Sequence, residues 1–151
     1  MRPRARALMT APTLHNGSRE DGTEDAPLPT VLVCDDAVGF RTMLGGLLSD
    51  AGHDVSFGCT REDSVACATA QQPDAMLVDP WMPIYDPALL RRLRACSPRS
   101  VIVMLSVLPA HESTRIIGGI GDIAAVVSKR DRPETIVAAV TAALLVPQRT
   151  G

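Results

Sequence analysis

The stretch TVLVCDDAVGF at residues 30–40 decides the fold. It opens with a continuous apolar run, as expected of a strand that is buried on both faces of a sheet. Two adjacent aspartates, Asp35 and Asp36, end the run, and a helical pattern starts directly after them. The 3.6-residue period puts the apolar residues of that helix on one face, which consists of Phe40, Met43, Leu44, Leu47 and Leu48. A strand, an acidic turn and a helix predict the start of a βα unit.

Four further apolar runs repeat this pattern along the chain. They are DVSFG at 54–58, DAMLVD at 74–79, SVIVML at 100–105 and IAAVV at 123–127. Gly52 is a plausible end of the first helix, and later helical patterns lie at 61–71, 87–96, around 111–117 and at 133–146. Five strands alternating with five helices predict an α/β fold, a flavodoxin-like, doubly wound parallel sheet of five strands with helices on both faces.

The composition argues for one domain and against nucleic-acid binding. A chain of 151 residues has room for one ordinary core but not for two. The formal net charge of -2 and the pI of about 5.9 provide no basic surface for DNA or RNA. An aromatic content of 3% leaves no platform on which bases could stack. We therefore expect no direct binding to nucleic acid.

The cysteines and the apolar runs indicate a cytoplasmic protein. The four cysteines are scattered without a C-x-x-C pair, which argues against a zinc site and fits a reducing compartment. No apolar run is long enough to span a bilayer, and no secretory signal pattern follows the N-terminal arginines. We expect a cytoplasmic location and no membrane partner.

Both ends of the chain differ in composition from its middle. Residues 1–28 are rich in Pro, Gly, Ser, Thr and charge, so we expect a disordered extension. The domain should then cover residues 29–147, with a tail at 148–151. Only PQRTG follows the last helical pattern, so the sequence predicts no attached output domain.

Polar side chains collect where the predicted strands end. Asp35 and Asp36 follow the first strand, Asp79 the third, Ser106 the fourth and Lys129 the fifth. Parallel strands bring their carboxyl ends to one edge of the sheet, where ligands bind. Three carboxylates there would repel by about 4 kcal/mol per pair at about 4 Å, which Mg²⁺ would relieve. Beside Mg²⁺, a hydroxyl and an ammonium, Asp79 is suited to accept a phosphoryl group.

Four motifs follow one another on the predicted strand ends: VLVCDD, MLVDPWMP, VIVMLS and VVSKRDRPETIVAAV, extending from about residue 30 to 146. In these motifs the chain resembles the receiver domains of bacterial response regulators in two-component signal transduction. Each motif alone is weak, whereas four in the right order on the right elements are strong.

The resemblance implies a role for each residue at the strand ends. Asp79 would be the phospho-acceptor, Ser106 the switch hydroxyl and Lys129 the phosphate-contacting lysine. The Mg²⁺ ligands would be Asp35, Asp36, Asp79 and the backbone carbonyl of Trp81. Such a protein is not an enzyme in the usual sense, because it takes a phosphoryl group from a sensor histidine kinase or a phosphotransfer protein and signals by contact with an output protein.

Some positions leave alternatives open. Receivers usually carry an aromatic residue three positions before the lysine, where this chain has Val126. A phosphorylation-independent interaction module is therefore the second hypothesis. A phosphatase with an aspartate nucleophile would need a second acid where Trp81 stands. Asp36 could instead cap the first helix.

Two further features complete the expectations. In PETIVAAVTAALLV, at 133–146, few residues are polar, so we expect a largely alanine outward face that could form a homodimer. Alanine is also simply a good helix former. His15, His53 and His111 have no evident partners, and we assign them no role.

Overall fold

Strands and helices alternate through the part of the chain that the structure, a computed structural model, describes: residues 26–109, 111–113 and 123–146. The strands are β1 (Thr30–Cys34), β2 (Asp54–Gly58), β3 (Ala75–Val78), β4 (Val101–Ser106) and β5 (Ala125–Ser128). The helices are α1 (Val38–Asp50), α2 (Arg61–Gln71), α3 (Pro87–Cys96) and α5 (Pro133–Leu145). Each strand begins and ends within two residues of its predicted position.

The five strands form one parallel sheet in the order β2-β1-β3-β4-β5. The strand order reverses between β1 and β3, which is where ligands bind in open α/β sheets. Cys34 pairs with Val78, and Ser106 with Ser128. The predicted α/β, doubly wound fold is therefore confirmed, and the residues that follow these strands share one edge of the sheet.

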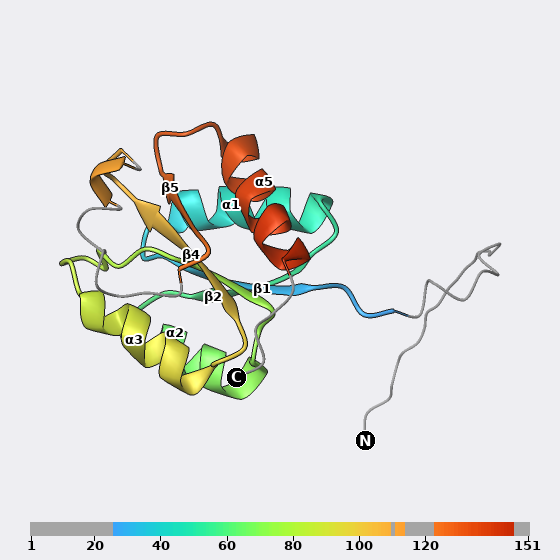
Figure 1. The fold of residues 1–151 in the computed structure, drawn as a ribbon, viewed down its shortest axis with the longest axis horizontal. Coiled ribbons are helices and arrows are strands. Elements are labelled where there is room, and N and C mark those ends of the chain that lie inside the picture. Colours follow the sequence, from blue (N-terminus) through green and yellow to red (C-terminus); the bar gives the residue numbers. More distant parts are fainter. Residues whose placement is uncertain (1–25, 110, 114–122, 147–151) are drawn as a thin grey trace, which may run out of the picture.

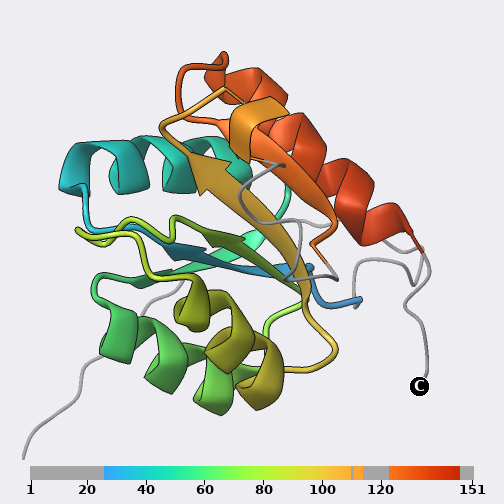
Figure 2. The same ribbon diagram turned by 60° about the vertical axis from the view of Figure 1, so that its left-hand side comes forward.

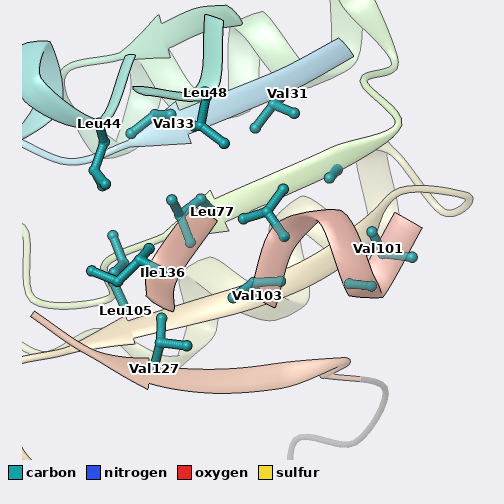
Figure 3. Packing of buried hydrophobic residues seen from close by; sticks show 13 residues of the cluster. Val31, Val33, Leu44, Leu48, Leu77, Val101, Val103, Leu105, Val127 and Ile136 are labelled. Carbon is teal, nitrogen blue, oxygen red and sulfur yellow. The ribbon is translucent and has the colours of Figure 1, made fainter. Parts of the chain in front are cut away.

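Two layers of helices enclose the sheet, with α1 and α5 on one face and α2 and α3 on the other (Figures 1 and 2). Successive side chains of a strand point to opposite faces of the sheet. Val31 and Val33 therefore belong to the core under α1 and α5, and Leu32 to the core under α2 and α3. Figure 3 shows the first core, in which side chains of the two helices fill the space above the sheet. Burial on both faces explains the continuous apolar runs of β1, β3 and β4. The prediction of burial on both faces is wrong for β2, an edge strand in which only Gly58 is buried.

Local signals in the sequence set the ends of several helices. Thr60 caps α2 by accepting a hydrogen bond from the Asp63 N–H at 3.0 Å. Asp86 caps α3 in the same way, and Pro87 occupies the first position of that helix. After α1, Gly52 has a φ of 96°, a left-handed conformation that glycine adopts freely.

Parts of three predictions lie outside the described residues. Of the helix expected around 111–117, the structure describes 111–113, which are helical. Nearly all of the predicted extension at 1–28 and the whole tail at 148–151 are also outside. Within the described residues, no helix is both long and apolar enough to span a membrane.

The last helix, α5, corrects two expectations. Its exposed residues are Glu134, Thr135, Ala138, Thr141, Ala142 and Leu145. The prediction of a largely alanine outward face is wrong, because Ala143 is buried and Ala139 packs against the core under α1 and α5. His53 has a partner after all: its buried side chain places Nε2 3.3 Å from the Thr141 hydroxyl. The histidine therefore joins the end of α1 to α5.

Candidate functional site

Three aspartates meet at the edge of the sheet where the strand order reverses. Asp35 and Asp36 follow β1, and Asp79 follows β3. The Asp79 N–H continues the ladder by donating to the Cys34 carbonyl at 2.9 Å. One carboxylate oxygen from each aspartate lies within 4.8 Å of the other two. Asp35 and Asp79 are buried, whereas Asp36 is exposed.

Backbone N–H groups hold the two buried carboxylates in place. Asp35 Oδ1 accepts from the Ala37 N–H at 2.8 Å, and Asp79 Oδ1 accepts from the Trp81 N–H at 2.8 Å. Each bond reaches two residues ahead, so each aspartate stabilises its own turn. The N-cap of α1 is Ala37, without a side-chain hydrogen bond, so Asp36 does not occupy the N-cap position as the alternative supposed.

Lys129, the only lysine of the chain, bridges the two buried carboxylates. Its Nζ lies 2.7 Å from Asp35 Oδ2 and 2.7 Å from Asp79 Oδ2. It also lies 4.8 Å from the centre of the Phe40 ring, a cation–π distance. The Lys129 N–H donates to the Ser106 carbonyl at 2.7 Å, which fixes the lysine backbone beside β4.

The pKa values of the acceptor candidate and the lysine respond to burial and to each other. Burial raises the pKa of Asp79, while Lys129 and the Trp81 N–H lower it and Asp35 raises it; the pKa ends above the ordinary aspartate value. Burial lowers the pKa of Lys129, but its bonds to Asp35 and Asp79 outweigh this, and the pKa is raised. The ammonium therefore stays protonated between two carboxylates that repel each other.

Ser106 ends β4 beside the lysine, but its hydroxyl is bonded to the loop that follows. The side chain is fully buried. Its oxygen accepts from the Leu108 N–H at 2.9 Å and from the Ser113 hydroxyl. The structure thus brings Ser106 to the predicted edge of the sheet and ties its hydroxyl to Ser113.

Trp81 and Tyr85 belong to the loop that follows Asp79, and their side chains pack against each other. Their ring centres lie 4.7 Å apart at 33°, and their backbones form an antiparallel bridge. Both are half-buried, and Trp81 packs against the core under α2 and α3. Burial raises the pKa of Tyr85, which Arg91 partly opposes. The aromatic pair gives the loop a fixed shape next to the carboxylates.

Solved structures of response-regulator receivers share this arrangement of strands and helices. A CheY-like receiver domain protein from Methanospirillum hungatei JF-1 matches with a TM-score of 0.69 and 18% identity, over 78% of this chain and 94% of that one. Chemotaxis response regulator CheY4 of Vibrio cholerae matches with a TM-score of 0.69 and 23% identity, over 77% and 98%. This chain has the fold of a receiver domain.

A third similar structure contains groups that bear on chemistry. It is a response regulator from Burkholderia pseudomallei with a phosphorylated aspartic acid, a calcium ion and citrate. Its TM-score is 0.67 at 22% identity, over 76% of this chain and 68% of that one. No family model and no curated protein matches the sequence. Identities at this level establish the receiver fold alone.

The acidic cluster of this receiver fold suits a divalent cation. When ionised, three carboxylates and one ammonium leave two negative charges in a small volume. Carboxylate oxygens within 4.8 Å of one another can share one hard cation, directly or through the waters that Mg²⁺ retains. Asp35, Asp36 and Asp79 could hold it, and the bond to the Trp81 N–H keeps that residue's backbone beside them.

Some contacts of the site were not predicted from the sequence. Arg41 donates from its guanidinium to the Asp35 carbonyl at 2.7 Å, and Phe40 lies against the lysine ammonium. The helical period places Phe40 on the inward face, but it does not show that the ring meets a cation. Ser113 was also missed, because a lone serine in a polar segment carries no sequence signal.

Proposed function

We propose that this chain is a phospho-accepting receiver of a two-component phosphorelay. It takes a phosphoryl group from a phosphohistidine of a sensor histidine kinase or a phosphotransfer protein onto Asp79. The observation that carries the proposal is the placement of Asp79: a buried carboxylate with an ammonium 2.7 Å away and two further acids around it.

Three residues of the chain would each have a different role in the phosphoryl transfer. A carboxylate oxygen of Asp79 attacks phosphorus, the P–N bond to the donor imidazole breaks, and the imidazole keeps the electron pair. Each carboxylate oxygen has spare lone pairs, since Asp79 uses one oxygen for the Trp81 N–H and the other for Lys129. The Lys129 ammonium offsets negative charge on the transferred oxygens, and the Ser106 hydroxyl is the nearby donor that can bind one of them.

The cofactor we propose is Mg²⁺, with Asp35, Asp36, Asp79 and the Trp81 carbonyl as ligands. A bound divalent cation would supply charge neutralisation on the phosphoryl oxygens. The need for it arises from the chain itself, since Lys129 balances only one of three carboxylates. The similar Burkholderia structure holds a calcium ion together with its phosphorylated aspartic acid.

The chain would act as a cytoplasmic signalling protein rather than an enzyme with a released product. Phosphorylation adds nearly two negative charges and new acceptor oxygens at the edge of the sheet, by analogy with phosphoserine. Those changes can shift the loops after β3 and β4 between two conformations that an output protein distinguishes. The exposed face of α5 is our proposed site for an output partner or a second copy of the chain. It is half polar, with Glu134, Thr135 and Thr141 beside Ala138, Ala142 and Leu145.

A phosphorylation-independent module remains the second candidate. Val126 favours it, because the residue is aliphatic, half-buried and packed against the core under α2 and α3, so it cannot act as a mobile aromatic switch. The Lys129 bridge argues the other way, because an acidic cluster and its ammonium have no evident use in such a module.

One experiment separates the two candidates. The full chain is incubated with Mg²⁺ and either acetyl phosphate, followed by intact mass, or beryllofluoride, followed by fluorescence of Trp81, the only tryptophan. We expect one phosphoryl group per chain and a saturable fluorescence change, both lost in Asp79→Asn. Asp50→Asn, an exposed position at the end of α1, is the matched control. A wild type that gives neither response is the interaction module.

A further inference from the structure

Ser113 connects the proposed acceptor site to the segment that follows β4. Its hydroxyl donates to the Ser106 hydroxyl, and both side chains have 0% of their surface exposed. Ser106 is in turn joined to the lysine of the site, since the Lys129 N–H donates to its carbonyl at 2.7 Å. A single hydroxyl contact therefore ties the edge of the sheet to residues 111–113.

The segment after Ser106 has few other anchors among its described residues, 107–109 and 111–113. Ser113 is the one buried residue there, and Val107 is 44% exposed. The remaining bonds are local: the Leu108 N–H to the Ser106 hydroxyl, and the N–H groups of Glu112 and Ser113 to the Pro109 carbonyl at 3.0 and 3.1 Å. Loss of the Ser113 contact would thus free the described part of this segment.

The Ser106 hydroxyl has two competing uses. Its oxygen now accepts hydrogen bonds from the Leu108 N–H and the Ser113 hydroxyl, which hold the oxygen beside the loop, while Lys129 bonds to Asp35 and Asp79. Under the proposed function the same hydroxyl donates to a phosphoryl oxygen on Asp79. Turning toward that group moves the oxygen away from Ser113.

Val126 cannot serve as a relay that exchanges hydrogen bonds. Its strand neighbour is Met104, and it packs in the core under α2 and α3. An aliphatic side chain has no polar atom that could exchange one hydrogen-bond partner for another. A buried pair of hydroxyl groups can exchange partners in this way, because breaking their hydrogen bond leaves polar groups that must find new partners.

We propose that Ser113 is a positioning residue that couples the acceptor site to the segment described at residues 107–109 and 111–113. In the unphosphorylated protein it holds the Ser106 hydroxyl toward the loop. When that hydroxyl binds the phosphoryl group, Ser113 is released and the segment it anchors opens. This inference rests on the proposed function, because it needs a phosphoryl group on Asp79.

The test compares three variants of the full chain in the presence of Mg²⁺. Beryllofluoride is titrated while Trp81 fluorescence is followed, and hydrogen exchange of the amides at 107–113 is measured with and without it. Ser113→Ala should bind beryllofluoride roughly two- to tenfold more tightly than the wild type, because no hydrogen bond to Ser113 has to break. Ser113→Cys, close in size and a weaker donor, should fall between them.

Ser97→Ala is the matched control. Ser97 and Ser100 form another buried hydroxyl pair, 2.6 Å apart, before β4 and at the opposite edge of the sheet. We expect Ser97→Ala to bind beryllofluoride with the same affinity as the wild type. Hydrogen exchange of the amides at 107–113 should become faster when beryllofluoride is added to the wild type or to this control. In Ser113→Ala it should be fast both in the absence and in the presence of beryllofluoride.

The possible outcomes separate the relay from the function on which it rests. A wild type without an Asp79-dependent response overturns both. A wild type that responds, with Ser113→Ala identical to it in affinity and exchange, overturns the relay and leaves the proposed function standing. Weaker binding in both Ser113 variants would also overturn the relay. If Ser113→Ala does not fold, Ser113→Cys supplies the comparison.

Discussion

Replacing Lys129 by methionine tests the electrostatics of the site directly. The substitution keeps most of the side-chain volume and removes the ammonium that lies 2.7 Å from both Asp35 and Asp79. Two carboxylate oxygens of the cluster lie no more than 4.8 Å apart, so their charges repel by at least about 3.5 kcal/mol at an effective dielectric constant of 20. Removing one partner of a buried ion pair costs about 3–5 kcal/mol. We expect the free energy of unfolding to fall by about 3 kcal/mol at pH 7 in EDTA.

Urea unfolding followed by circular dichroism measures this change. Arg130→Met, at the exposed neighbouring position, is the control and should stay within about 0.5 kcal/mol of the wild type. Mg²⁺ should stabilise Lys129→Met more than the wild type, since the variant has three carboxylates and no ammonium. If Lys129→Met unfolds within about 0.5 kcal/mol of the wild type in EDTA, the reasoning is wrong.

The same variant has a defined pH dependence. The gap between Lys129→Met and the wild type should shrink as the pH falls, because Asp79, whose pKa burial raises above the ordinary aspartate value, then takes up a proton and the repulsion inside the cluster is relieved. In the wild type the lysine pKa is raised, so its stabilisation is complete below about pH 10.4, the unfolded value, and is lost as the pH rises through the folded value.

Four further substitutions test the site and the packing around it. Asp79→Asn removes one carboxylate from Lys129, so its pKa should fall and acetic anhydride should modify it faster at pH 8, as measured by mass spectrometry of the only lysine. The half-buried Trp81 lies two residues after Asp79, where its indole would shade a phosphoryl group from attacking water. Trp81→Asn should therefore speed loss of phosphate from the phosphorylated chain, and an unchanged half-life would contradict this shielding. Gly58→Ala should lower the free energy of unfolding by roughly 1–3 kcal/mol, because an added Cβ would lie 2.7 Å from a backbone atom of α2. Gly46→Ala meets nothing within 4 Å on an exposed helix position and should raise it by roughly 0.5–1 kcal/mol in the same urea titration.

The strands could be predicted because their sequence signal is local. VLVC, at residues 31–34, and VIVML, at 101–105, are continuous apolar runs, and each is buried along its length in a strand covered on both sides. The exact ends of the strands were harder to predict. The sequence places Ser106 directly after a strand, but in the structure it is the last residue of β4 and pairs with Ser128. Polar residues at strand ends are ambiguous, because burial there depends on what the next loop brings to them.

The contents of the site could be predicted only as a set of neighbours. The spacing of the strand ends places Asp35, Asp79 and Lys129 at one edge of any parallel sheet. It does not show that the lysine bridges both buried acids, or that Asp36 stays exposed. Those outcomes depend on side-chain conformations chosen by packing.

The sequence by itself thus determined the α/β fold and the edge of the sheet at which the polar residues gather. Both follow from local features, because the periodicity of apolar residues and the positions of the strand ends depend only on residues that are close together in the sequence. Only the tertiary structure decided which hydroxyl meets which partner. Ser106 bonds to Ser113, seven residues away across a turn, and His53 contacts Thr141, which is 88 residues away. The outward face of α5 was decided in the same way, since α1 and the sheet determine which alanines are covered. Contacts between distant residues depend on how packed elements meet, and a local pattern does not contain that information.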